Sequence, residues 1–230
     1  MEFLRDVLEL FKTDLYMEMI FKGLETTLII SVTAALLGLL LGTVVALVGM
    51  APKSPWMKLP KALCKLYITV IRGTPMALQL FIMCYVIFAI RGFPEIVIAI
   101  IAFGINSGAY VAENIRAGIL SVDIGQTEAG RALGLTGGKT MMKIVIPQAI
   151  KNVIPSIGNE IIALIKETSI VSMVGMYDLT NAAKIIGGGS YMASYIVPST
   201  VAALFYLAIV YLLTFAIKLI ERRLRVGDKR

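Results

Sequence analysis

Long apolar runs with few charged residues alternate along this chain with short polar stretches. Each run is long enough for an α-helix to cross a bilayer. The pattern predicts an all-α membrane protein whose residues 1–230 form a single transmembrane domain. Five transmembrane helices are expected, at residues 24–50, 67–90, 95–119, 152–174 and 195–220.

The polar stretches outside these runs predict three further features. Residues 1–22 carry apolar side chains at helical spacing among acidic ones, which predicts an amphipathic helix at the membrane surface. Residues 176–194 are polar and glycine-rich, and they predict a long external loop with a short helix at 177–186. Residues 120–151 form a polar link between the third and fourth spans.

This link contains two helical signals. Strong helix formers run from Thr127 to Leu133, and Gly134 follows as a C-terminal stop. A second short helix is expected from Gly138 to Ile144, ending ahead of Pro147. Two short helices at about a right angle would make a rigid knob on the membrane surface, suited to a pocket on a soluble partner.

Glycine and proline also mark special positions inside the spans. Proline removes a backbone donor and glycine eases a bend, so Arg72-Gly73-Thr74-Pro75 predicts a break in the second span. Two pairs of glycines, each one turn apart, predict close helix packing: Gly38 with Gly42, and Gly104 with Gly108. The first pair is expected to pack within the same subunit.

Composition supports the membrane class, and charge predicts an orientation. Hydrophobic residues make up 58% of the chain and charged residues only 16%, against about 25% charged residues in soluble domains. Sixteen Lys and Arg residues border one side of the spans and five border the other. We therefore expect the N-terminus outside, and the link and the C-terminus in the cytoplasm.

Other functional classes find little support. The basic residues are not interleaved with stacking aromatic residues, which argues against nucleic-acid binding. Cys64 and Cys84 show no paired spacing and are expected to be buried thiols. The stretch from Leu133 to Thr140 resembles a phosphate-binding loop, but that loop requires glycine where Leu133 stands. With no His and no nucleophile beside a base, we expect no enzyme, no metal and no cofactor in this chain.

Four separated motifs resemble the permease subunits of ATP-binding-cassette (ABC) importers, in the branch for polar amino acids. The motifs are Arg72–Pro75, Gly108–Glu113, the link with Glu128-Ala129-Gly130, Gly134 and Pro147, and Gly158-Asn159-Glu160 with Lys166–Ser169. The resemblance implies the type I importer permease fold. It also implies that Glu128 and Ala129 lie on a helix that docks into a cleft of the ATPase, and that Gly134 permits the turn after it. Gly130 stands where many relatives have alanine.

The fourth span carries the best candidate for substrate binding. An ionisable residue inside a span is costly and is a functional candidate by default. Glu160 lies roughly 12 Å into that span, at 1.5 Å per residue from Asn152. Asn159 precedes it, and Thr168 and Ser169 could offer hydroxyls. Glu160 could instead be a structural carboxylate paired with a basic residue of another span.

Three weaker candidates lie in the second and third spans. Gln79 and Tyr110 are more typical of packing or of hydrogen bonds between helices. Arg72 could neutralise a substrate carboxylate, or it could anchor the helix break at the cytoplasmic side.

The expected function is that of the permease subunit of an ATP-driven amino-acid importer in the bacterial cytoplasmic membrane, working by alternating access. The resemblance implies two ATPase subunits that bind the ATP, a second and identical permease subunit, and a separate solute-binding protein. A carboxylate at position 160 and the resemblance together favour arginine, lysine or histidine, with glutamine second. The alternatives are an ion-coupled secondary transporter, which also has broken helices and a midplane carboxylate, and a structural or channel-forming membrane protein.

Overall fold

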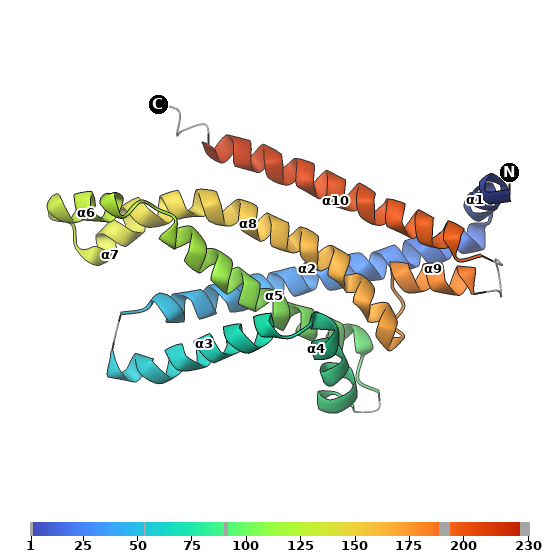
Figure 1. Ribbon diagram of the computed structural model, residues 1–230, viewed down its shortest axis with the longest axis horizontal. Coiled ribbons are helices and arrows are strands. Elements are labelled where there is room, and N and C mark those ends of the chain that lie inside the picture. Colours follow the sequence, from blue (N-terminus) through green and yellow to red (C-terminus); the bar gives the residue numbers. More distant parts are fainter. Residues whose placement is uncertain (1, 53, 90–91, 189–193, 226–230) are drawn as a thin grey trace. The chain divides into compact units, whose positions relative to one another are not determined.

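The computed structural model describes residues 2–52, 54–89, 92–188 and 194–225, and they are almost entirely helical (Figure 1). These residues divide into two compact units, each assembled from three stretches of chain. The described residues of Met1–Leu36, Pro75–Gly104 and Ile161–Leu212 form unit 1, and those of Leu37–Thr74, Ile105–Glu160 and Leu213–Arg230 form unit 2.

Ten α-helices make up the described part of the chain. They are α1 (Glu2–Lys12), α2 (Asp14–Met50), α3 (Lys58–Gly73), α4 (Met76–Ile82), α5 (Glu95–Leu120), α6 (Ile124–Ala132), α7 (Gly137–Thr140), α8 (Ile146–Glu167), α9 (Leu179–Gly187) and α10 (Ile196–Arg225). Short 3₁₀ helices occupy Pro55–Met57 and Thr168–Val174, and π-helical turns occupy Met83–Ile87 and Met141–Val145.

Three of these helices, α2, α5 and α10, are long and apolar enough to cross a membrane. Helices α3 and α4 would add a fourth span if the broken pair is counted as one. Helix α8 has 22 residues, which give it a length of about 33 Å at 1.5 Å per residue. Its polar residues make it less apolar than the helices that are apolar enough to cross a membrane. The third and fifth apolar runs are thus confirmed as helices, while five membrane crossings stay a prediction.

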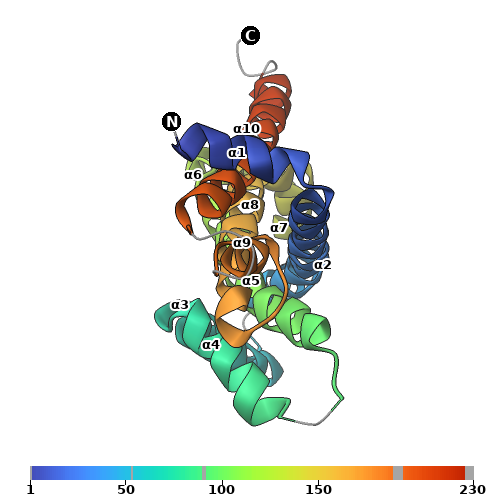
Figure 2. The ribbon, with the colours of Figure 1, turned by 90° about the vertical axis from the view of Figure 1, so that its right-hand side faces the viewer.

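The N-terminal helix is shorter than the sequence suggested. The predicted helix over residues 1–22 is wrong in extent, because α1 ends at Lys12 and α2 begins at Asp14. Helix α1 lies beside α9 and the start of α10 (Figure 2). Leu10 is fully buried there, in one apolar cluster with Leu179 and Val197. The side of α1 that carries Leu10 is therefore covered by protein within unit 1, while Leu8 and Phe11 are exposed.

Helix α9 confirms the short helix expected in the external loop, although residues 189–193 of that loop lie outside the described residues. The buried Asp178 caps α9, since its carboxylate accepts the backbone N–H groups of Thr180 and Asn181 at 3.1 and 2.8 Å. Burial raises the pKa of this carboxyl, against the lowering effect of these hydrogen bonds. A Cβ at Gly23 would lie 2.7 Å from the Asp178 carbonyl oxygen, so only glycine lets α2 approach α9 this closely.

Close packing of α2 on α5 defines unit 2. A Cβ at Gly38 would lie 2.8 Å from the Ser107 Cβ, and one at Gly42 would lie 2.6 Å from the Val111 Cβ. The prediction that the first glycine pair packs within the subunit is confirmed. The Tyr67 hydroxyl on α3 donates to the Ile105 carbonyl at 2.5 Å and so fixes α3 to the same helix.

The break predicted in the second apolar run is confirmed. Helix α3 ends at Gly73 and α4 begins at Met76, and both Thr74 and Pro75 have extended backbone dihedral angles. Pro75 cannot donate a backbone hydrogen bond, and it disfavours helical geometry in the residue before it. The end of the predicted span, at Ile90, lies outside the described residues.

Candidate functional site

The polar link forms a compact helical segment that belongs entirely to unit 2. Helix α6 begins at Ile124, and Asp123 caps it by accepting the Gly125 N–H at 2.7 Å. Helix α7 lies beside α6 (Figure 1), and the Thr136 side chain caps it by accepting the Lys139 N–H at 3.4 Å. The two caps explain why such short helices have defined starts.

Gly134 ends α6 as the sequence predicts. Its φ is +81°, in the left-handed region that favours glycine. The Leu135 N–H bonds the Gly130 carbonyl at 3.1 Å, and the Gly134 N–H bonds the Arg131 carbonyl at 3.0 Å. This pair of bonds is the Schellman arrangement of a helix C-terminus. The Arg131 guanidinium also donates to the Leu135 carbonyl, at 3.0 Å, which braces the turn between α6 and α7.

The prediction that a second short helix ends before Pro147 is wrong. Helix α7, the π-helical turn Met141–Val145 and α8 follow one another without a gap, and Pro147 is the second residue of α8. A π-helical turn shifts the hydrogen-bonding pattern by one residue, and this turn lies directly before Pro147, whose missing N–H leaves a carbonyl of the preceding turn without its usual donor. Helical structure therefore extends from the link into the predicted fourth span.

Side-chain contacts attach α6 to the longer helices of unit 2. The Gln148 amide donates to the Gln126 side chain at 3.2 Å, and the Asn152 amide donates to the Ser121 hydroxyl at 2.9 Å. Gly130 is buried, and a Cβ there would lie 2.8 Å from side-chain atoms of Thr140 and Ile144. Glycine at this position therefore serves close packing of α6.

The outer surface of the segment is exposed and partly apolar. Glu128 and Ala129 are both exposed on α6. Large apolar side chains accompany them: Ile124 is 70% exposed, Leu133 82% and Met142 65%. Apolar side chains this exposed on a segment fixed by caps and hydrogen bonds are typical of a protein interaction site.

Two of the predicted substrate residues meet in unit 2. The Arg72 guanidinium lies over the Tyr110 ring, 5.2 Å from its centroid, a cation–π geometry. It also lies 3.9 Å from the Glu113 carboxylate. Glu113 accepts two hydrogen bonds from Arg116, one of them from Nε at 2.9 Å, as the spacing of the two residues on α5 predicts. Arg72 thus has partners within the chain, and it holds the end of α3 against α5.

Helix α8 carries the central candidate. Glu160 is half-buried and Asn159 is exposed. The preceding Gly158 packs closely, because a Cβ there would lie 2.8 Å from Ile217 of α10. Pro155 lies inside the same helix, one turn before Asn159. Glu160 therefore lies on a part of α8 that is packed within unit 2 and shaped by both glycine and proline.

The remaining candidates lie in unit 1. Thr168 is buried and donates to the Ile165 carbonyl at 2.6 Å, while Ser169 donates to the Lys166 carbonyl at 2.8 Å. Both hydroxyl protons are thus used within their own helix, and only the oxygen lone pairs could serve a ligand. Gln79 is half-buried on α4.

Sequence reasoning missed two capping residues and one ion pair. Asp123 and Asp178 each precede a short helix, a signal that could have been read from the sequence. The contact of Arg72 with Glu113 joins two helices and had no local signal. Cys64 and Cys84 are free thiols as expected, but they are only half-buried.

Comparisons with known proteins agree on one family. The family described as binding-protein-dependent transport system inner membrane component matches residues 38–226. The arginine transport system permease protein ArtQ of Bacillus subtilis (strain 168) is 40% identical over 211 residues, which cover 91% of this chain and 94% of that protein. The putative glutamine transport system permease protein GlnP of Rickettsia bellii (strain RML369-C) is 41% identical over 210 residues, with 90% and 94% coverage.

A solved structure gives the same result. The crystal structure of an amino acid ABC transporter with histidines matches with a TM-score of 0.83 at 40% sequence identity. The match covers 90% of this chain and 95% of that chain.

Proposed function

The chain belongs to the family of binding-protein-dependent transport system inner membrane components, and we propose that it carries cationic amino acids into the cell. It is a multi-pass protein of the bacterial inner membrane and the permease subunit of an amino-acid ABC importer. Permeases of this kind are transport components, and ATP hydrolysis belongs to a separate subunit that works with them and with a substrate-binding protein.

The observation that carries the substrate proposal is the half-buried carboxylate of Glu160 on α8. An ionised carboxylate attracts a cationic group most strongly where water is partly excluded. A guanidinium, ammonium or imidazolium group is such a cation, so arginine, lysine and histidine are the preferred substrates. The likeness to ArtQ, whose name specifies arginine transport, supports this choice.

Glutamine is the second candidate. It is favoured by relatives of similar identity that are named putative glutamine permeases. Glutamine carries no side-chain charge, so its amide could donate a hydrogen bond to Glu160 but would lack the charge attraction of the cationic substrates.

For the assembly, we propose two copies of this chain above two ATPase subunits. Each α6 would dock into one ATPase, with Glu128 and Ala129 at the contact and the exposed Ile124 and Leu133 beside them. Gly130, Gly134 and Pro147 would shape the segment without touching the partner. The exposed apolar surface of α6 in the isolated chain supports this arrangement.

Uptake of labelled amino acids into proteoliposomes tests the substrate proposal. The vesicles would hold the permease and its ATPase, with the substrate-binding protein outside and ATP inside. We expect Glu160→Gln to reduce arginine uptake between about tenfold and a hundredfold, because a hydrogen bond to a charged group contributes about 1.5–3 kcal/mol. Glutamine uptake, if present, should change much less.

Ser156→Ala is the matched control, because it removes a polar group one turn away on α8 and leaves the charge in place. Competition by unlabelled arginine, lysine, histidine and glutamine would rank the substrates. Unchanged arginine uptake by a Glu160→Gln variant present at wild-type levels in the membrane would exclude Glu160 from the site.

A further inference from the structure

A cavity of about 440 Å³ lies between α2, α3 and α5 in unit 2. It lies at the end of α2, whose last residue is Met50, and at the beginning of α3. By the distribution of Lys and Arg, this is the cytoplasmic side of the membrane. None of the candidate substrate residues lines the cavity, so it is separate from the site proposed on α8.

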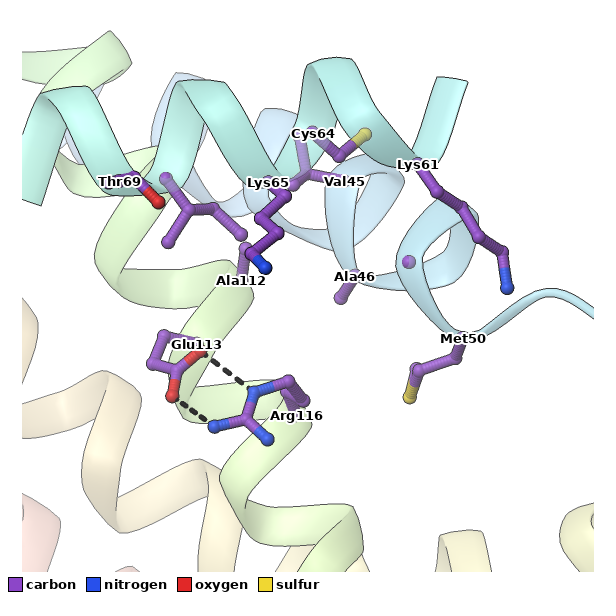
Figure 3. A pocket seen from close by; sticks show the side chains of 12 residues that line it. Val45, Ala46, Met50, Lys61, Cys64, Lys65, Thr69, Ala112, Glu113 and Arg116 are labelled. Carbon is purple, nitrogen blue, oxygen red and sulfur yellow. Dashed lines mark hydrogen bonds and ion pairs between the residues drawn. The ribbon is translucent and has the colours of Figure 1, made fainter. Parts of the chain in front are cut away.

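Cations predominate among the charged residues that line it. Lys61, Lys65 and Arg116 contribute three positive charges, and Glu113 contributes one negative charge. Lys61 donates to the Ala51 carbonyl, and Arg116 pairs with Glu113. In the part of the chain that the structure describes, the Lys65 ammonium has no hydrogen bond or ion pair, and its side chain points from α3 towards α5 (Figure 3). The cavity therefore offers a net positive charge to a ligand.

Most of the remaining lining is apolar. Val45, Ala46, Met50 and Ile68 line the cavity, and Thr69 adds one hydroxyl. Large apolar side chains on the outside of α3 are exposed as well, with Leu63 at 56% and Leu66 at 60%. A side of α3 with this character is suited to acyl chains, while the lysines reach the level of the headgroups.

We propose that this cavity binds one anionic phospholipid. The phosphate would lie between Lys65 and Arg116, and the first part of an acyl chain would contact Val45, Ala46 and Ile68. Basic pockets between transmembrane helices at the cytoplasmic side suit anionic headgroups, and each Lys or Arg near the membrane surface adds to the attraction. A soluble anion would also be attracted by the positive charges of the cavity, but it would not contact the apolar residues that line it.

Lipid titration by native mass spectrometry tests the proposal on the complex of the permease with its ATPase subunits. Phosphatidylglycerol would be added to the delipidated complex in detergent, and the bound lipid counted. We expect one tight site per permease chain. Lys65→Gln should weaken its apparent affinity about fivefold, because it removes one surface cation. Phosphatidylcholine, which has no net charge, should bind more weakly than phosphatidylglycerol.

A second variant fills part of the cavity without removing any of its positive charges. Gly49 lines the cavity, and a Cβ there would meet no atom within 4 Å. Gly49→Leu should fill part of the cavity and abolish the tight site. Leucine also favours a helix over glycine, so the variant should fold.

Lys58→Gln is the matched control, since Lys58 is exposed on the same helix and does not line the cavity. Four outcomes would overturn the proposal. Lys65→Gln and Gly49→Leu could both retain the tight lipid, or Lys58→Gln could lose it equally. Millimolar inorganic phosphate could displace the lipid from the tight site, which would identify a site for free anions. A change in the number of permease copies in the Gly49→Leu complex would assign the cavity to a subunit contact and overturn it too.

Discussion

Individual residues in this chain act mainly by allowing helices to approach or to end. Gly23, Gly42 and Gly130 each lie where a Cβ would meet other atoms at less than 3.0 Å. Gly134 differs, because a Cβ there would meet no atom within 4 Å, and its positive φ is the constraint. The two kinds of glycine predict different responses to the same substitution.

Gly134→Ala should loosen the turn between α6 and α7. An L-residue in the left-handed region costs about 1–2 kcal/mol, which would weaken the Schellman bonds to Arg131 and Gly130. Hydrogen exchange of the amides of α6 and α7, measured by mass spectrometry in detergent, should become faster. Gly138→Ala is the control, since Gly138 lies in open space with an ordinary φ. Equal protection in the two variants would contradict this account of Gly134.

At the scale of the helices, α6 is the element with the clearest separate role. Its inner side is fixed by Gly130 and Gln126, and its outer side exposes Glu128 and Ala129. The charge at position 128 can therefore be changed without disturbing the packing of the segment, which makes this helix a direct test of the proposed coupling.

Glu128→Lys should reduce both amino-acid transport and the stimulated hydrolysis of ATP. A reversed charge at a docked interface costs several kcal/mol, so we expect amino-acid uptake to fall at least about tenfold. Stimulation of ATPase activity by the substrate-loaded binding protein should fall with it. Glu128→Ala, which removes the charge without reversing it, should give an intermediate effect. Normal stimulated hydrolysis by the Glu128→Lys complex would rule out this docking role.

The helix boundaries also show which structural features local sequence patterns can predict. The break at Thr74 and Pro75 and the stop at Gly134 follow from local rules, and both were predicted. Pro147 was misjudged, because a proline usually ends or kinks a helix, and local sequence rules do not predict the π-helical turn that precedes it here.

The partial burial of Glu160 and the contact of Arg72 with Tyr110 could not be predicted in the same way. Both depend on which helices lie side by side, and the local spacing of residues carries no such information. For the candidate site, the sequence could thus supply the residues but not their partners.

At the scale of the whole molecule, the two compact units share long helices. The chain passes between the units five times, and four of the passages lie within α2, α5, α8 and α10. Each of these four helices contributes residues to both units, and the link with α6 and α7 belongs to unit 2. In the family to which the chain belongs, ATP hydrolysis is the task of a separate subunit.

Transport should therefore require nucleotide and not an ion gradient. In proteoliposomes that contain the permease and its ATPase, arginine uptake should depend on internal ATP and should persist when ionophores collapse the proton and sodium gradients. Vesicles with the permease alone should show no uptake above background. Gradient-driven uptake in vesicles without the ATPase would instead identify an ion-coupled transporter.

The π-helical turn at Met141–Val145 has a consequence for chain length. A π-helical turn holds one more residue than the α-helical turn it replaces. If one residue were deleted there, the turn could close up as an ordinary α-helical turn, and α7 and α8 would present nearly the same faces to their neighbours. A residue deleted from the regular part of α8 before Gln148 would instead rotate everything before it by about 100° around the helix axis, and Glu128 would point in a different direction.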